Sequence, residues 1–320
     1  YALSDNGTLA YVRPDPASNH STPLWVDRQG NSQPVPAPRS WFDFPYLSPD
    51  NRRLALTIRE DPRADVWVWD FARGAFTRVT FEGNNHAQIW TPDGERLVFS
   101  SDREGPQANL WWARADGAGK AERLTSSPNH QDPGSFSPDG KLLAFGEIDS
   151  AGNFDIWVIH FEQGRRIEPF LNTKFAEHTP VISRDGKWIA YTSDESGRPE
   201  IYVQPFPKGG ARYQISTDGG EEALWRPDGG EIYYRRGPDV LAASVSAGER
   251  FAAGKPRVLF RGDYRPRTGF GYPNWDISRD GKRFIMLKPY QPDPPTPRQI
   301  VVVLNWFEEL KRLAPPAKQP

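Results

Sequence analysis

The sequence has no cysteine, one methionine (Met286) and five histidines among its 320 residues. Without cysteine, disulfide bonds, thiolate nucleophiles and cysteine-based metal sites are all excluded. A chain without cysteine is compatible with both oxidising and reducing surroundings, so this absence does not indicate a compartment.

An excess of charge of either sign is also missing. The 40 Lys and Arg residues nearly balance the 41 Asp and Glu residues, which gives a formal net charge of −1. Because no global basic field would attract a polyanion, we expect no nucleic-acid partner. No apolar run approaches the roughly 18 residues of a membrane-spanning helix, so we expect no membrane contact from this chain.

The motifs of several enzyme classes are absent. The sequence has no G-x-S-x-G elbow, no Gly-rich phosphate loop, and neither H-R-D nor D-F-G. We therefore predict that the chain is not an enzyme and carries no cofactor. It begins at Tyr1 without a signal peptide, and we expect it to be a piece of a longer protein.

What the sequence does have is an internal repeat centred on an Asp-Gly turn. Two clear copies are WTPDGERLVFS from Trp90 and FSPDGKLLAFG from Phe136. The spacings between successive copies are 45, 43, 46, 46, 43 and 52 residues. A period of about 40–45 residues is typical of a β-propeller. The turn aspartates are Asp5, Asp50, Asp93, Asp139, Asp185, Asp228 and Asp280.

Each copy reads as a four-stranded antiparallel blade. Around Asp93, two short strands flank the Pro-Asp-Gly turn, a third strand follows a polar loop, and a fourth contains Leu124. The second strand alternates large and small apolar residues, as Leu97, Val98 and Phe99 show, so both of its faces are expected to be covered. We predict an all-β fold, a seven-bladed propeller of four-stranded blades. A six-bladed propeller is the alternative, if the first and last copies merge.

Aromatic residues recur on the third strands. Trp67, Trp111 and Trp157 occupy equivalent positions, and we expect them to be buried between blades. The last copy differs, because it runs into an amphipathic segment instead of a fourth strand. We therefore predict a propeller over residues 1–304 and a short helix with its tail over residues 305–320, packed on the propeller.

The S-P-D-G-K-x-[LI]-A-[FY] strand followed by [DN]-[IL]-W-V resembles the TolB-type propeller repeat. Two segments, EALWRPDGGEIYYR from Glu222 and VVVLNWFEELKRL from Val301, resemble the C-terminal propeller of bacterial membrane-anchored serine/threonine kinases. This resemblance implies an extracytoplasmic or periplasmic sensor module of a receptor-like kinase that binds a ligand or a protein. We also expect the domain to be monomeric. Any kinase activity would belong to sequence outside this chain.

Titratable residues recur seven positions before the turn aspartate, where the innermost strand begins. In a propeller this position lies near the mouth of the central channel, so we predict a binding site there for a protein, peptide or small molecule. A water-filled channel lined with polar groups would give the same pattern. The predicted site residues are Asp43, His86, Asp132, His178 and Glu221.

Histidine suggests a second hypothesis. His86, His130 and His178 each precede an inner strand, and with Asp132 they could hold a divalent metal in a lyase or hydrolase. However, His130 lies nine residues before its turn aspartate and the other two lie seven before theirs. The three positions are not equivalent, so we predict no metal site and keep the metal-dependent enzyme as the alternative.

Overall fold

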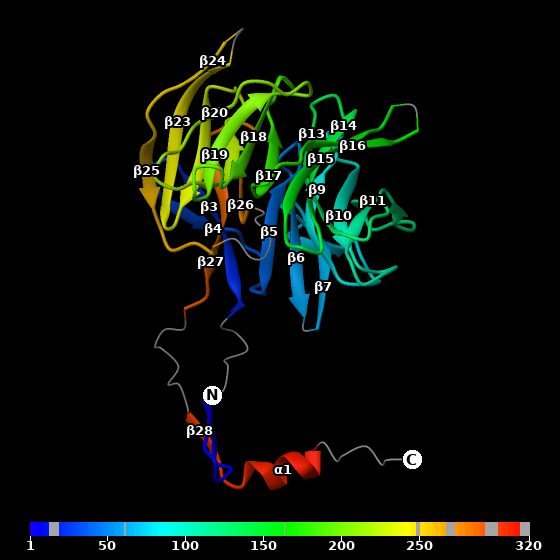
Figure 1. Cartoon of the computed structure of the whole chain (residues 1–320), viewed down its shortest axis with the longest axis vertical. Coiled ribbons are helices and arrows are strands. Elements are labelled where there is room, and N and C mark those ends of the chain that lie inside the picture. The colour runs from blue at the N-terminus through cyan, green and yellow to red at the C-terminus, as the bar shows by residue number, and fades with distance from the viewer. Residues whose placement is uncertain are drawn as a thin grey trace. The chain divides into compact units, whose positions relative to one another are not determined.

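A computed structural model describes residues 1–12, 19–60, 62–162, 164–247, 250–266, 273–291 and 300–313. The chain divides into two compact units, and Figure 1 labels strands of both. The larger unit is Ser21–Pro289, and the smaller one combines Tyr1–His20 with Tyr290–Pro320. We expected the division between residues 304 and 305. It differs because strands from both ends of the chain pair with each other in the smaller unit.

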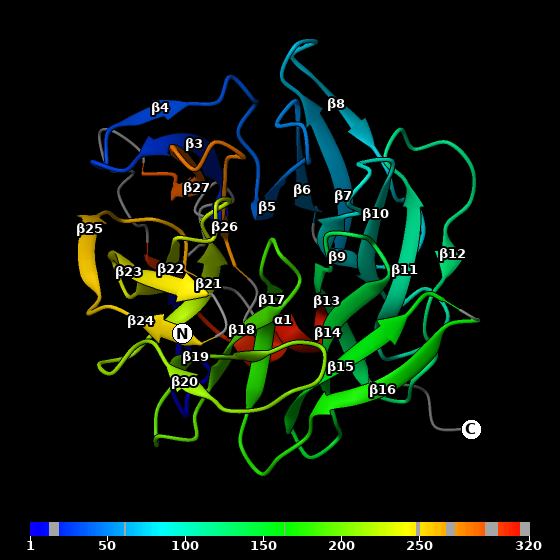
Figure 2. The ribbon, with the colours of Figure 1, turned by 90° about the horizontal axis from the view of Figure 1, so that it is seen from above.

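The larger unit consists of six antiparallel sheets arranged around a central axis (Figure 2). The first blade is β5 (Phe42–Leu47), β6 (Arg53–Glu60), β7 (Arg63–Asp70) and β8 (Ala75–Arg78). The second is β9 (Asn85–Trp90), β10 (Arg96–Ser101), β11 (Asn109–Arg114) and β12 (Glu122–Arg123). The third is β13 (His130–Phe136), β14 (Leu142–Ile148), β15 (Phe154–His160) and β16 (Arg166–Leu171). In each of these blades the first strand lies nearest the axis.

The remaining three blades keep this order. The fourth is β17 (Glu177–Ile182), β18 (Trp188–Ser193), β19 (Glu200–Pro205) and β20 (Tyr213–Gln214). The fifth is β21 (Glu221–Trp225), β22 (Glu231–Arg236), β23 (Asp239–Ala247), β24 (Phe251–Ala253) and β25 (Arg257–Arg261). The sixth is β26 (Trp275–Ile277), β27 (Arg283–Pro289), β3 (Ser21–Asp27) and β4 (Ser32–Pro34).

The sixth blade joins the two ends of the larger unit. β27 pairs antiparallel with β3 from Arg283↔Asp27 to Pro289↔Ser21, so the last inner strands are completed by the first outer strands. The all-β class and the antiparallel four-stranded blades are confirmed. The described residues form seven sheets for the seven repeats, but six of these sheets are blades of the larger unit. The first and last copies therefore share their strands, which is the six-bladed alternative.

The seventh sheet forms the smaller unit. It contains β1 (Ala2–Leu3), β2 (Leu9–Val12) and β28 (Ile300–Val303), in the order β1-β2-β28, followed by the predicted helix α1 (Trp306–Leu313). The backbone N–H of Trp306 donates to the Gly7 carbonyl at 2.6 Å, and the Phe307 ring lies against Gly7. The helix thus packs on the β1–β2 hairpin. The predicted tail, residues 314–320, lies outside the described residues.

The Asp-Gly turns explain why the copies fold alike. In the second blade, Asp93 Oδ1 accepts hydrogen bonds from the Thr91 hydroxyl at 2.5 Å and the Glu95 N–H at 2.9 Å. Thr91 Oγ1 in turn accepts the Arg96 N–H at 3.0 Å. Gly94 adopts a φ of 71°, which favours glycine. Serine replaces Thr91 in the same network around Asp50, Asp139, Asp185 and Asp280.

The core lies between the blades, as the alternation of large and small residues predicts. Leu97 and Phe99 pack into a cluster with the first blade, and Val98 packs into a cluster with Leu143 of the third. Of the three tryptophans that we expected to be buried, Trp111 is buried, while Trp67 and Trp157 are half-buried. No helix among the described residues is long and apolar enough to cross a membrane.

Candidate functional site

A bulge follows the predicted site position on the inner strands. Phe44, Ala87, Thr179 and Glu222 adopt φ values between 53° and 58°, and each stands directly after a predicted site residue. The strand register shifts at these points. A bulge bends its strand and redirects side chains. The register of β13 shifts at the equivalent place, between Pro133 and Ser135.

Asp43 is fully buried and ion-paired. Its carboxylate accepts hydrogen bonds from Arg59 Nε at 2.6 Å and from Arg265 Nε at 2.8 Å. The two guanidinium groups compensate the charge that burial would otherwise make costly. Asp43 therefore adds little free negative charge to this end of the channel.

His86 and Asp132 are in direct contact, and His130 joins them. The Nε2 atoms of His86 and His130 lie 3.4 and 2.8 Å from the two Asp132 carboxylate oxygens. The imidazole rings stack with 5.5 Å between their centroids. The Ser100 hydroxyl donates to the same carboxylate. All three ligand atoms lie within 4.8 Å of one another, a spacing that could accommodate one metal ion.

This contact changes the titration of both partners. Burial disfavours the charged forms of Asp132 and His130, but their mutual attraction outweighs it. The pKa of Asp132 is therefore well below its ordinary value, and the pKa of His130 is raised. Asp132 stays ionised at neutral pH, as a metal ligand must.

His178 and Glu221 occupy equivalent places on β17 and β21. His178 is buried, with its Nδ1 atom 2.8 Å from the Thr179 hydroxyl and its ring 5.6 Å from that of Phe154. Glu221 is half-buried and stands opposite Arg235 in the strand register. The structure therefore places all five predicted residues on inner strands.

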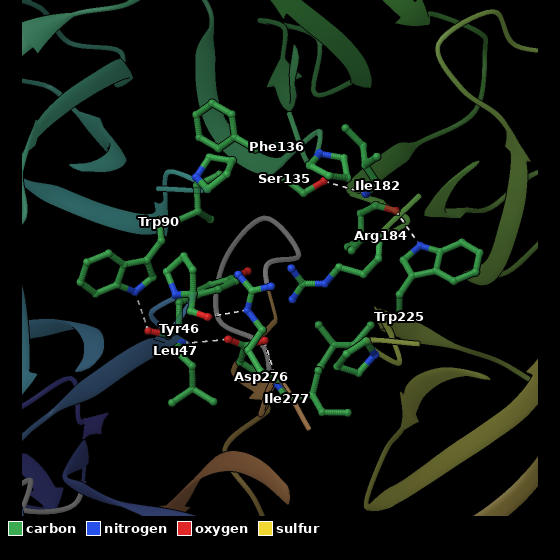
Figure 3. A pocket seen from close by; sticks show the side chains of 18 of the residues that line it. Tyr46, Leu47, Trp90, Ser135, Phe136, Ile182, Arg184, Trp225, Asp276 and Ile277 are labelled. Atoms are coloured by element: carbon green, nitrogen blue, oxygen red, sulfur yellow. Dashed lines mark hydrogen bonds between the residues drawn. The ribbon is translucent and has the colours of Figure 1, made fainter. Parts of the chain in front are cut away.

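A cavity lies at the opposite end of the inner strands, beside the Asp-Gly turns (Figure 3). Its volume is about 440 Å³, and all six blades contribute to its wall. The wall combines aromatic and aliphatic groups with a few polar ones. Residues lining the cavity include Tyr46, Ser48, Trp90, Ser135, Phe136, Ile182, Arg184, Trp225, Asp276, Ile277 and Arg279.

Asp276 lines this cavity, and backbone hydrogen bonds hold its carboxylate in place. Its carboxylate accepts the backbone N–H groups of Leu47 at 2.8 Å and Ile277 at 2.7 Å. Burial raises the pKa of Asp276 to about 6, although these donors and the guanidinium groups of Arg184 and Arg279 oppose the shift. Asp276 is thus a carboxylate whose charge changes near neutral pH.

The predicted site did not include this cavity. The sequence holds a signal for it, because Arg184 and Arg279 stand where four other turns have proline. Both arginines line the cavity. Comparing the copies with one another at this position, and not only at the start of the inner strand, would have identified them.

Comparison with known proteins supports the fold independently. The family model of the TolB β-propeller domain matches residues 29–145 and 117–262, most of the larger unit. The Tol-Pal system protein TolB of Anaeromyxobacter dehalogenans is 35% identical over 99 residues, 31% of this chain and 22% of that protein. An uncharacterized Agrobacterium fabrum protein, Atu1656, is 23% identical over 59% of this chain and 68% of its own length. The chain thus spans about a fifth of the TolB protein that it matches.

Solved structures share the architecture. The structure of a putative TolB from Agrobacterium tumefaciens superposes with a TM-score of 0.67 at 20% identity, covering 85% of this chain and 99% of its own. An oligogalacturonate lyase in complex with manganese gives 0.54 at 13% identity, with coverage of 91% and 99%. At these identities the similarity concerns the fold alone. Because the family model covers most of the sequence, this chain belongs to the TolB β-propeller family.

Proposed function

We propose that this chain is a non-enzymatic binding module whose ligand enters the cavity beside the Asp-Gly turns. The cavity of about 440 Å³ carries this proposal, because its size suits a small molecule or the end of a peptide. Trp90, Phe136 and Trp225 offer aromatic surface there, while Ser48 and Ser135 offer hydrogen-bonding groups. Apolar walls with a few polar groups are typical of ligand pockets.

The biological role of the domain is proposed from the proteins that it resembles. Membership of the TolB family supports a role in binding proteins or peptides. The resemblance of Glu222–Arg235 and of the segment from Val301 to kinase-linked propellers supports an extracytoplasmic sensor domain of a larger bacterial protein. We propose that the domain is monomeric. The ring of Asp43, His86, Asp132, His178 and Glu221 remains a proposed second contact surface at the other end of the channel.

A substitution that fills the cavity tests this function. Pro138 lines the cavity at the turn position where Arg184 and Arg279 stand in two other blades, so the turn accepts residues other than proline. We expect Pro138→Trp to fold and to obstruct the cavity. The control is Pro106→Trp, in the exposed loop between β10 and β11, at the other end of the second blade from its Asp-Gly turn.

The measurement is a saturation-transfer NMR screen of a small-molecule fragment library against the three proteins. We expect fragments that bind the natural protein and Pro106→Trp to lose their signal with Pro138→Trp. If all fragment hits are retained with Pro138→Trp, the ligand site lies elsewhere and the proposal fails.

The His86–His130–Asp132 cluster favours metal-dependent chemistry as a second candidate function. Two imidazoles and one carboxylate would leave further coordination positions open, as in catalytic zinc sites. The test is to incubate the protein with Zn²⁺ or Mn²⁺ and measure the metal retained. Loss of retention in His86→Ala, but not in His160→Ala, would support it. His160 is the matched control because it also contacts a carboxylate, Glu168, at 2.7 Å. Failure of the natural protein to retain either metal would exclude this candidate.

A further inference from the structure

The turns at the cavity differ in the residue that stands directly before the turn aspartate. The residue before the turn aspartate is proline in four blades and arginine in the fourth and sixth blades. Proline presets the backbone of this turn, so its replacement gives up a local advantage. The residues at this position are Pro49, Pro92, Pro138, Arg184, Pro227 and Arg279.

Arg184 extends from its turn into the cavity (Figure 3). Among the described residues, no hydrogen bond or ion pair involves its guanidinium group. Arg279 lines the same cavity and is anchored, because its Nε donates to the Pro49 carbonyl at 2.5 Å. One guanidinium is thus fixed against the wall, and the other projects into the space.

The two arginines and Asp276 interact electrostatically. Burial lowers the pKa of Arg184, the positive charge of Arg279 lowers it further, and Asp276 opposes both effects. Asp276 offers one carboxylate to two guanidinium groups, and both its oxygens already accept backbone N–H groups. Among the residues that line the cavity, the two guanidinium groups therefore outnumber the one carboxylate when Asp276 is ionised.

The surroundings of this charge are largely apolar. Trp90, Phe136, Ile182, Trp225 and Ile277 line the cavity around the arginines. An anion in such a space is held by charge-assisted hydrogen bonds, and the planar guanidinium matches a carboxylate in particular. A phosphate, with a charge approaching −2, would suffer more from the neighbouring Asp276.

We propose that the cavity binds the carboxylate of a partner peptide, at its C-terminus or on an acidic side chain, between Arg184 and Arg279. The aromatic walls then contact the apolar part of the peptide. This inference rests on the proposed function, since it assumes that the ligand enters this cavity. It adds the chemical class of the ligand and the two residues that select it.

The experiment compares N-acetyl-phenylalanine with N-acetyl-phenylalanine amide by NMR titration of the full chain. The two probes differ only in the carboxylate. We expect the acid to bind about tenfold more tightly than the amide, as a charge-assisted contact predicts. This ratio should approach one in Arg184→Gln and in Arg279→Gln. It should be unchanged in Arg73→Gln, whose exposed side chain lies on the outer turn before β8.

The other outcomes separate the two proposals. If acid and amide bind equally, and both are lost with Pro138→Trp, the cavity is the ligand site but the carboxylate inference is overturned. Retention of the ratio in Arg184→Gln/Arg279→Gln, or no binding of the acid at millimolar concentration, overturns it as well. Displacement of the acid by inorganic phosphate at equal concentration would assign the arginines to phosphate instead.

Discussion

The indole Nε1 of Trp90 donates a hydrogen bond to the backbone carbonyl of Tyr46 at 2.9 Å, and so ties the inner strand of one blade to that of the preceding blade. The fourth and fifth blades repeat this contact, with Trp225 donating to Val181 at 2.9 Å. Trp275 makes a related bond to Glu222 at 3.1 Å. These bonds stabilise the channel wall from which the cavity is built.

Trp225→Phe removes one of these bonds and leaves the Val181 carbonyl without its indole donor. We expect it to lower the free energy of unfolding by roughly 1–3 kcal/mol. The control is Trp112→Phe, because Trp112 also donates through Nε1, but to the exposed Glu122 at 3.0 Å. Urea denaturation measures both. Equal losses in the two variants would contradict a specific role for the bond between blades.

The division of the chain predicts that the larger unit folds alone. We expect a chain of residues 19–291 to unfold cooperatively within about 2 °C of the full chain, a shift that corresponds to about 1 kcal/mol at this size. A chain of residues 41–291 is the control, since it lacks β3 and β4 and leaves β27 unpaired on one side. Thermal unfolding of residues 19–291 far below the full chain would show that the smaller unit stabilises the propeller.

The sequence predicts the blades well because each blade is a local pattern. Around Asp93 and its equivalents, turn chemistry and alternating apolar residues occur within about 40 residues, so they can be read without knowing distant partners. The closure depends on a choice between distant partners. Segments at both ends of the chain read as strands, and which of them pairs with β27 or β28 is decided by packing.

Some features of the candidate site can likewise be predicted from the sequence, and others cannot. The equivalence of Asp43, His86 and His178 can be read from spacing alone. Their partners cannot, because Arg265 reaches Asp43 from 222 positions away. The left-handed backbone of the residues that directly follow them is also unexpected from the sequence. Phe44, Ala87 and Thr179 are residue types that rarely adopt a positive φ.

Asp276 should make the stability of the cavity depend on pH. Its pKa is raised from 3.8 to about 6 in the folded chain, so ionising it is less favourable there than in the unfolded chain. Stability from this group is present at low pH and lost as pH rises from about 4 to 6. Relative to Asp276→Asn, we expect the natural protein to lose up to about 3 kcal/mol between pH 4 and 7.5. Chemical denaturation at several pH values measures this difference, and a difference that does not vary with pH would contradict it.

Asp132 should show the opposite dependence. Its lowered pKa contributes stability above the ordinary value of 3.8, and this is lost as pH falls through the folded value. The raised pKa of His130 contributes stability that is fully present below 6.5 and lost as pH rises through the folded value. The contact is therefore strongest between about pH 4 and 6.5.

Asp132→Asn removes the charge that both imidazoles face. At pH 5.5 we expect it to lower the free energy of unfolding by about 3 kcal/mol, the low end of the range for breaking a buried ion pair. At pH 8.5 the loss should be smaller, because neutral imidazole gains only a hydrogen bond from the carboxylate. Glu168→Gln is the control, since it removes the partner of His160 on the exposed surface and should cost less than about 1 kcal/mol. If Asp132→Asn costs the same at both pH values, the carboxylate does not act through protonated His130. If it costs no more than Glu168→Gln, the contact does not stabilise the fold.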